Sequence, residues 1–312
     1  MAEGKWITGL KSGLSLDEAA RIVLPIRFDA VLLHLPGAVE SAGADPEHVH
    51  QLRVATRRSA ASLGFFGACL PEKRARQLRK ALRTLRRAAG SARDWDVFFQ
   101  LLQDAKPLQA AKAAPARDFL FGFASARRVD AQKQLSEAAA KVGESFREEA
   151  DRIKDDSFDW QAPVGDMTLG KRALKELNEL LSELDAQSTP PPTVYEALHQ
   201  LRILGKQLRY SMELFADCFE APFREELYPE IEQMQEILGH VTDAHVAAEH
   251  LQEAREFLLA FHKTAYPRFK APIEAIRKAC TLTISRERRR FLAWLPKWRK
   301  RKAEMKLEGL LR

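Results

Sequence analysis

An internal repeat is the feature that most limits the folds open to this chain of 312 residues. Shifting the sequence by 149 residues places the segment HQLR at 50–53 on a second HQLR at 199–202. The same shift, with no gap, aligns further identical residues: Phe66 with Phe215, Cys69 with Cys218, Leu78 with Leu227, Gly90 with Gly239, Asp94 with Asp243 and Val97 with Val246. One register that holds over such a length predicts two related halves.

Hydrophobic periodicity predicts that both halves are helical. Apolar residues recur every three or four positions, for example in segments 78–89 and 174–184, and no long stretch alternates apolar with polar residues. Proline and glycine residues, Gly90 and Gly239 among them, divide the chain into expected helices of about 12–25 residues. The longest helix is expected near 115–155. The predicted fold class is therefore all-α.

The repeat and the breaks divide the chain into four segments. We expect an N-terminal extension at 1–14, a first helical half at 15–160, a second helical half at 166–285 and a basic C-terminal helical tail at 286–312. No apolar run approaches the roughly 20 residues that span a bilayer, so no membrane span is expected. The N-terminus has no basic region followed by an apolar one, as a secretory signal would have.

The three cysteines fit a cytoplasmic protein. Cys69, Cys218 and Cys280 are odd in number and widely spaced, and none belongs to a CxxC motif. This pattern favours buried, reduced thiols over a disulfide framework or a zinc site.

Positive charge is concentrated in a few stretches of the chain. The net charge is +7, and residues 53–93 contain twelve Lys or Arg against one acid. Like charges at i, i+4 destabilise a helix by about 0.2–0.5 kcal/mol per pair. Two interpretations follow: the basic face at 76–87 binds a polyanion, or it pairs with the acidic segment 224–239 of the other half.

Each copy of the repeated segment places a histidine and two or three cations on one helix face. Because successive helical residues lie about 100° apart, offsets of 0, 3 and 7 fall within an arc of about 60°. The faces comprise His50, Arg53 and Arg57 in the first half and His199, Arg202, Lys206 and Arg209 in the second. Guanidinium groups bind phosphate oxygens in bidentate fashion, so the faces predict a phosphate-bearing polyanion. For each histidine, a packing or capping role remains the alternative to ligand contact.

Four linked segments resemble the CHAD family, the conserved histidine α-helical domain, over roughly residues 15–285. They are HQLRVATRR, LRRAAGSARDWDV, LHQLRILGKQLRYSMELF and ILGHVTDAHV. The resemblance implies two four-helix bundles related by a pseudo-two-fold axis, with basic residues along a shared surface or pore. It also implies binding of inorganic polyphosphate and association with cytoplasmic polyphosphate granules, without catalysis, cofactor or metal. No ExExK-type strand of an attached CYTH domain is present, so the chain resembles the stand-alone form.

The ligand positions that the resemblance implies are all basic. They are His50, Arg53, Arg57, Arg79, Lys80, Arg83, Arg87, His199, Arg202, Lys206 and Arg209. Ala60 and Ala61 stand where another basic residue is usual, and segment 224–238 has Glu and Gln where bases would be symmetrical. We therefore expect an asymmetric site that relies mainly on the first half.

Two other functions remain as alternatives. A phosphatase acting on polyphosphate or triphosphate would need an acidic cluster facing the basic row, and Glu225, Glu226, Glu230 and Glu232 are the nearby candidates. A nucleic-acid-binding protein would usually add aromatic platforms or base-reading Asn and Gln, whereas leucine and alanine flank these basic faces.

The remaining constellations favour structural roles. His240, Asp243, His245 and Glu249 lack the HExxH pattern of a metal site, and Asp94 and Asp243 are expected to cap the helices that follow Gly90 and Gly239. In the tail, Trp294 and Trp298 are expected to pack on the second bundle with the bases exposed, a membrane-surface helix being the alternative.

Overall fold

The computed structural model describes residues 5–40, 45–162 and 167–312, and within these ranges the chain is helical and contains no strand. The first half forms α1 (Leu16–Glu40), α2 (Glu47–Phe66), α3 (Glu72–Asp104) and α4 (Ala114–Arg152). The second half forms α5 (Leu169–Gln187), α6 (Tyr195–Phe215), α7 (Tyr228–Phe261) and α8 (Pro267–Glu304). The predicted all-α class is confirmed.

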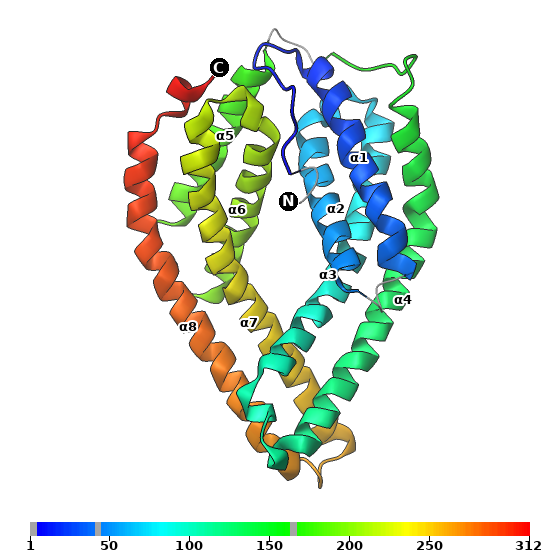
Figure 1. Cartoon of the computed structure of the whole chain (residues 1–312), viewed down its shortest axis with the longest axis vertical. Coiled ribbons are helices and arrows are strands. Elements are labelled where there is room, and N and C mark those ends of the chain that lie inside the picture. Colours follow the sequence, from blue (N-terminus) through cyan, green and yellow to red (C-terminus); the bar gives the residue numbers. More distant parts are fainter. Residues whose placement is uncertain (1–4, 41–44, 163–166) are drawn as a thin grey trace.

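The two sets of four helices stand side by side, and the lower parts of α3, α4, α7 and α8 converge below the shorter helices (Figure 1). The main helix–helix contacts between the halves join α2 to α6, α3 to α7 and α4 to α8. Each of these pairs takes the same position in both halves. Two copies of one sequence segment are therefore brought face to face at α2 and α6.

The core lies where the helical periodicity places it. Leu78, Leu82 and Leu85 of α3 are buried, whereas the charged residues between them are exposed. In α5 the same spacing buries Leu177 and Leu181. Because full burial of a leucine side chain stabilises a fold by about 1.5–3 kcal/mol, these stripes fix which face of each helix turns inward.

Side-chain caps mark the beginning of two helices. At α1, Glu18 accepts the backbone N–H of Ser15 at 2.8 Å, and Ser15 Oγ accepts the N–H of Glu18 at 3.3 Å. This reciprocal pair is a capping box. At α5, the side chain of Thr168 accepts the N–H of Lys171.

The expected helix ends at Gly90 and Gly239 are wrong, because α3 and α7 continue through both glycines. Asp94 and Asp243 consequently lie inside helices and cap nothing. A glycine in a helix interior costs only about 1 kcal/mol relative to alanine, and the packed residues on either side offset this. A Cβ at Gly90 or Gly239 would meet no atom within 4 Å.

The two terminal segments both pack against the helices. Helix α8 crosses the position between 285 and 286 without a break, so the basic residues beyond it belong to the last helix of the second half. Trp294 and Trp298 are buried and Lys297 is exposed, which confirms the packing interpretation of the two tryptophans. Near the N-terminus, Ile7 and Leu10 are buried as well.

Two further expectations concern the class of protein. Cys69, Cys218 and Cys280 are buried and free, as predicted. The expectation that no apolar run has the length of a membrane span is wrong for α1, because this helix is long enough and apolar enough to cross a membrane. A buried core helix passes the same test, and in the described structure α1 packs against α2 and α4.

Candidate anion-binding site

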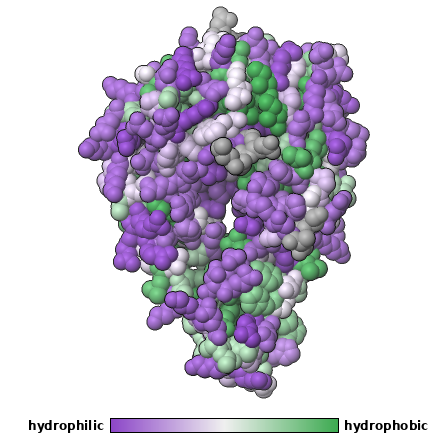
Figure 2. Space-filling model, in the orientation of Figure 1, coloured by the Kyte–Doolittle hydropathy of each residue, from purple (hydrophilic) through white to green (hydrophobic). Residues whose placement is uncertain are grey.

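The predicted basic faces of α2 and α6 meet between the two halves. Two pockets of about 340 and 640 Å³ lie there and share Arg57, His199 and Arg202. We call them the Asp94 pocket and the Lys206 pocket after a residue that lines each, and together the central cavity. An opening between the halves is visible in the space-filling view (Figure 2).

Both halves supply the charged walls of the central cavity. The Asp94 pocket adds Arg53 from α2 with Asp94 from α3, and Tyr195 and Asp243 from the second half. The Lys206 pocket adds Arg86, Lys206 and Tyr210. The predicted residues that line the cavity are therefore Arg53, Arg57, His199, Arg202 and Lys206.

The guanidinium groups in the cavity repel one another. Burial, followed by the charge of Arg57, lowers the pKa of Arg53 to about 10, although Asp94 lies 4.0 Å from it and acts in the opposite direction. Burial also lowers the pKa of Arg202. Both remain cationic at neutral pH, because a guanidinium group stays charged even where burial lowers its pKa.

Lys206 is the most strongly perturbed cation of the central cavity. Burial, together with the charges of Arg202, Arg57 and Arg53, lowers the pKa of Lys206 to about 5. Lysine shifts its pKa readily under such conditions, whereas arginine stays charged. Without a bound anion, Lys206 is therefore a neutral amine at pH 7.

Several guanidinium N–H groups in the cavity lack acceptors. Within the part of the chain that the structure describes, the buried Nε atoms of Arg53, Arg57 and Arg202 have no hydrogen-bond partner. A buried donor left unsatisfied costs about 1–3 kcal/mol, and more when it is charged. Three such donors around one cavity make it a site for an anion rich in acceptor oxygens.

Carboxylates compensate part of this charge. Asp94 and Asp243, which are equivalent in the repeat, line the Asp94 pocket together with Glu249, and Glu176 lines the Lys206 pocket. Burial and the negative charge of Asp243 raise the pKa of Asp94, while Arg53 acts to lower it. Four carboxylates therefore face four guanidinium groups and Lys206, and one positive charge remains in excess once the amine is protonated.

The two repeat histidines occupy different surroundings. His199 lines the central cavity, and its Nδ1 lies 3.4 Å from the hydroxyl of Tyr195. Burial and the charge of Arg202 lower its pKa. His50 does not line the described cavity, and burial and the charge of Arg93 lower its pKa. Neutral rings at pH 7 follow for both, since the ordinary pKa is already near 6.5.

The basic face of α3 is divided between the cavity and the outer surface. Arg79, Arg83 and Arg87 are exposed. Arg86, which is not one of the predicted ligands, lines the Lys206 pocket. Its place is readable from the sequence, because Arg79, Arg83 and Arg86 follow helical spacing. Lys80 instead lines a separate groove between α3 and α4.

The alternative in which this face pairs with the acidic segment 224–239 has no support in the contacts. Glu232 pairs with Lys5 at 3.2 Å, and Glu226 pairs with Arg301 at 3.0 Å. Across residues 5–40, 45–162 and 167–312, no ion pair joins a base of α3 to an acid of that segment. Arg76 pairs with Glu72 of its own helix at 3.4 Å, whereas Arg79, Arg83 and Arg87 are exposed and remain available to a ligand.

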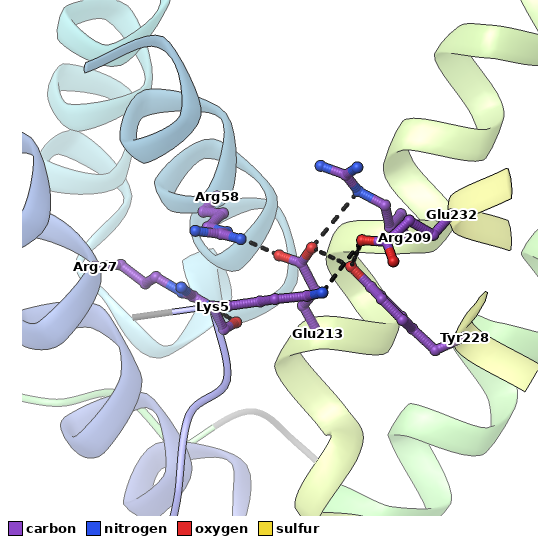
Figure 3. A network of polar contacts seen from close by, with 7 residues as sticks. All are labelled: Lys5, Arg27, Arg58, Arg209, Glu213, Tyr228 and Glu232. Carbon is purple, nitrogen blue, oxygen red and sulfur yellow. Dashed lines mark hydrogen bonds and ion pairs between the residues drawn. The ribbon is translucent and has the colours of Figure 1, made fainter. Parts of the chain in front are cut away.

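A buried carboxylate follows the last base of the α6 basic face, and Figure 3 shows its polar contacts. Glu213 accepts hydrogen bonds from Arg58 Nε at 2.7 Å and from the Tyr228 hydroxyl at 2.7 Å. Arg209 Nε lies 3.5 Å from the same carboxylate. We call these four residues the Glu213 network. Arg209, a predicted ligand, therefore points at an internal carboxylate and does not line the central cavity.

The candidate metal constellation is not assembled. His245 lies 3.6 Å from Glu249 and stacks on Tyr195 at 3.5 Å, and His240 lies 3.8 Å from Glu287. Among the residues that the structure describes, no three His, Cys, Asp or Glu side chains are placed to hold a metal ion.

Comparison with known proteins gives one consistent result. The family model described as CHAD domain matches residues 23–252. The crystal structure of the CHAD domain from the plant Ricinus communis is similar, with a TM-score of 0.68, 22% identity, and coverage of 93% of this chain and 95% of that one. PptA from Streptomyces chartreusis is similar with a TM-score of 0.69, 14% identity, and coverage of 90% and 99%. No curated protein matches.

Proposed function

This chain belongs to the CHAD domain family, and from that premise we propose that it binds inorganic polyphosphate in the central cavity and catalyses no reaction on it. The observation that carries the proposal is the set of buried guanidinium donors from both halves that lack acceptors, those of Arg53, Arg57 and Arg202. Each phosphate of a polyphosphate chain offers several acceptor oxygens and a negative charge.

A linear polyanion fits the cavity better than a small anion does. The Asp94 and Lys206 pockets adjoin through Arg57, His199 and Arg202, and Arg86 continues the basic lining toward the exposed face of α3. A row of cations that extends from a cavity to a surface matches an anion with a regular charge repeat. The Asp94 carboxylate faces Arg53 and helps to balance its charge, which supports a binding role over a catalytic one.

The proposal also covers location. A protein that binds several consecutive phosphates of a polyphosphate chain would be retained on cytoplasmic polyphosphate granules. The test is a fluorescent fusion viewed together with a polyphosphate stain, and loss of overlap in a cavity variant is the expected result.

Binding is tested by titration calorimetry with polyphosphate of defined length. The double variant Arg53→Gln/Arg202→Gln removes one cation from each half, and Lys133→Gln/Lys297→Gln removes two exposed bases from the outer helices as the matched control. A hydrogen bond to a charged group is worth about 1.5–3 kcal/mol, so the cavity variant is expected to bind roughly a hundredfold more weakly or worse. Equal affinities in both folded variants would exclude these arginines from the site.

The two alternative functions give different results in the same material. Gel analysis after incubation with Mg²⁺ or Mn²⁺ reports whether the chains become shorter, which would indicate a phosphatase. For a nucleic-acid-binding protein, DNA would displace polyphosphate at equal phosphate concentration. The competition is run at fixed salt, because counterion release makes every polyanion affinity salt-dependent.

A further inference from the structure

The basic stripe of α6 ends in a carboxylate. Residues at offsets of 0, 3, 7, 10 and 14 along a helix lie within an arc of about 80°. On α6 these positions hold His199, Arg202, Lys206, Arg209 and Glu213. The α6 face thus carries cations at its first four positions and a carboxylate, Glu213, at its last.

Glu213 is fully committed to neighbouring cations. Its side chain is 1% exposed, and it accepts hydrogen bonds from Arg58 of the facing half and from the Tyr228 hydroxyl. It also forms an ion pair with Arg209 of its own helix, whose Nε lies 3.5 Å away and makes no hydrogen bond within the described residues. Burial opposes a high pKa for Arg209, but Tyr210 and Glu213 outweigh it and raise that pKa. A phosphate that reached Arg209 would stand beside this buried carboxylate, and the two negative charges would repel each other.

The helices beside this carboxylate differ between the halves. On α7 the repeat equivalents of Arg79 and Arg83 are Tyr228 and Glu232, and Glu232 pairs with Lys5 at 3.2 Å. On α3, Arg86 lines the cavity and the next bases up the helix are exposed. One way out of the cavity thus passes the bases of α3, with Glu176 as the carboxylate of that pocket, whereas the other meets Glu213 and Glu232.

Resting on the proposed function, we propose that Glu213 determines where the polyphosphate site ends. It neutralises the top of the α6 stripe, so that the bound chain contacts Arg202 and Lys206 but not Arg209. The chain then leaves the cavity along α3, past Arg86. Glu213 is a positioning residue, because it acts through its ion pairs with Arg58 and Arg209 and does not touch the ligand.

Two matched substitutions test this arrangement in the full chain. Arg86→Met and Arg209→Met each remove one guanidinium, and affinity for polyphosphate of one defined length is measured from about 50 to 300 mM salt. The slope of log affinity against log salt reports the number of counterions released, which is close to one for each phosphate that a cation neutralises. We expect Arg86→Met to flatten the slope by about one and to weaken binding about tenfold, and Arg209→Met to leave both unchanged. Equal effects of the two substitutions would overturn the proposal.

A second pair of variants separates this role from a purely structural one. Glu213→Gln removes the charge that opposes a phosphate at Arg209 and is expected to steepen the salt slope by about one. Glu144→Gln makes the same charge change at a side chain of α4 that is 78% exposed, and it is expected to leave the slope unchanged. Arg58→Met/Glu213→Gln serves if the single variant fails to fold, because it removes both members of the buried pair. An unchanged slope in the folded variants would refute the proposal. If the wild type binds no polyphosphate, the proposed function itself fails.

Discussion

Affinity for polyphosphate is expected to fall as the pH rises, because Lys206 has to take up a proton when the anion binds. In the free protein, burial and three neighbouring arginines lower the pKa of Lys206 to about 5. A phosphate in the Lys206 pocket supplies the negative charge that the amine lacks and raises its pKa toward the ordinary value. The protonated amine is thus favoured in the complex and disfavoured in the free protein.

The magnitude follows from linkage between proton and ligand. With a pKa of about 5, only about one free molecule in a hundred carries the proton on Lys206 at pH 7. Below pH 5 both states are protonated, and the pH has no effect through this group. Above pH 5, up to the pKa of the complex, binding takes up one proton, so affinity falls about tenfold per pH unit.

Titration calorimetry in pairs of buffers with different ionisation enthalpies counts the protons taken up. At pH 7.5–8.5 we expect close to one proton per site for the wild type. His199, Asp94 and Asp243 also face the cavity, but the histidine pKa is lowered, so it contributes mainly below pH 6.5. Long chains are used because their inner phosphates stay ionised over this range.

Lys206→Arg is the matched control, since arginine remains charged at every pH used. It is expected to bind without proton uptake and with little pH dependence, and Lys206→Met is expected to bind weakly, also without proton uptake. Proton uptake that persists in Lys206→Arg at pH 8 would refute the reasoning. So would a wild-type affinity that does not change between pH 6 and pH 8.

Three further predictions concern stability. Lys206→Met is expected to raise the free energy of unfolding at pH 7 by a few kcal/mol, because between about pH 5 and pH 10 the unfolded wild-type chain holds a proton that the folded protein lacks. The stability of the wild type therefore rises with pH over this range. The gain from the substitution, measured by denaturant titration, is expected to shrink from pH 6 to pH 9. Gly90→Ala and Gly239→Ala are each expected to stabilise the fold by about 0.5–1 kcal/mol in the same assay, and destabilisation would show that the added Cβ is not free of contacts. In the wild type, Asp96 lies 2.6 Å from Arg128 Nε. Arg128→Met leaves this carboxylate buried without its partner and is expected to lower the free energy of unfolding by about 3 kcal/mol, which thermal unfolding measures. An unchanged midpoint would mean that the pair contributes nothing to stability.

The sequence is sufficient to predict the helical class and the repeat. Leucine spacing reports burial directly, so the α3 stripe of Leu78, Leu82 and Leu85 is predictable. Helix ends are less predictable, because a single glycine is a weak signal. At Gly90 and Gly239 the tertiary contacts of the flanking turns decide that the helix continues.

The boundary before the basic segment is harder to predict than the packing of that segment. Arginines and lysines dominate the composition after residue 285, and on that ground the stretch is predicted to be a separate basic helical tail, with Trp294 and Trp298 packed on the second bundle. Phe291, Trp294, Leu295 and Trp298 follow helical spacing and are buried, and α8 continues through the predicted boundary. Their spacing, unlike the net charge, identifies the segment as part of a packed helix.

The same limit applies to the candidate site. Offsets along a helix show which side chains share a face, and Arg53, Arg57, Arg202 and Lys206 do meet in one cavity. Offsets do not show which neighbour covers part of that face. Arg209 belongs to the α6 stripe, and its i, i+4 spacing to Glu213 can be read from the sequence. The burial of Glu213 against Arg58 and Tyr228 of other helices cannot.

The cavity cations make the ligand-free fold less stable than its packing would allow. Lys206 stays neutral at pH 7, and the guanidinium groups beside it retain buried donors without acceptors. An anion that supplies both charge and acceptors removes these costs only in the folded state. The stabilisation by bound ligand grows as RT ln(1 + [L]/Kd), so polyphosphate should raise the unfolding temperature of the wild type more at pH 6 than at pH 8. Stability and binding thus depend on the same few side chains.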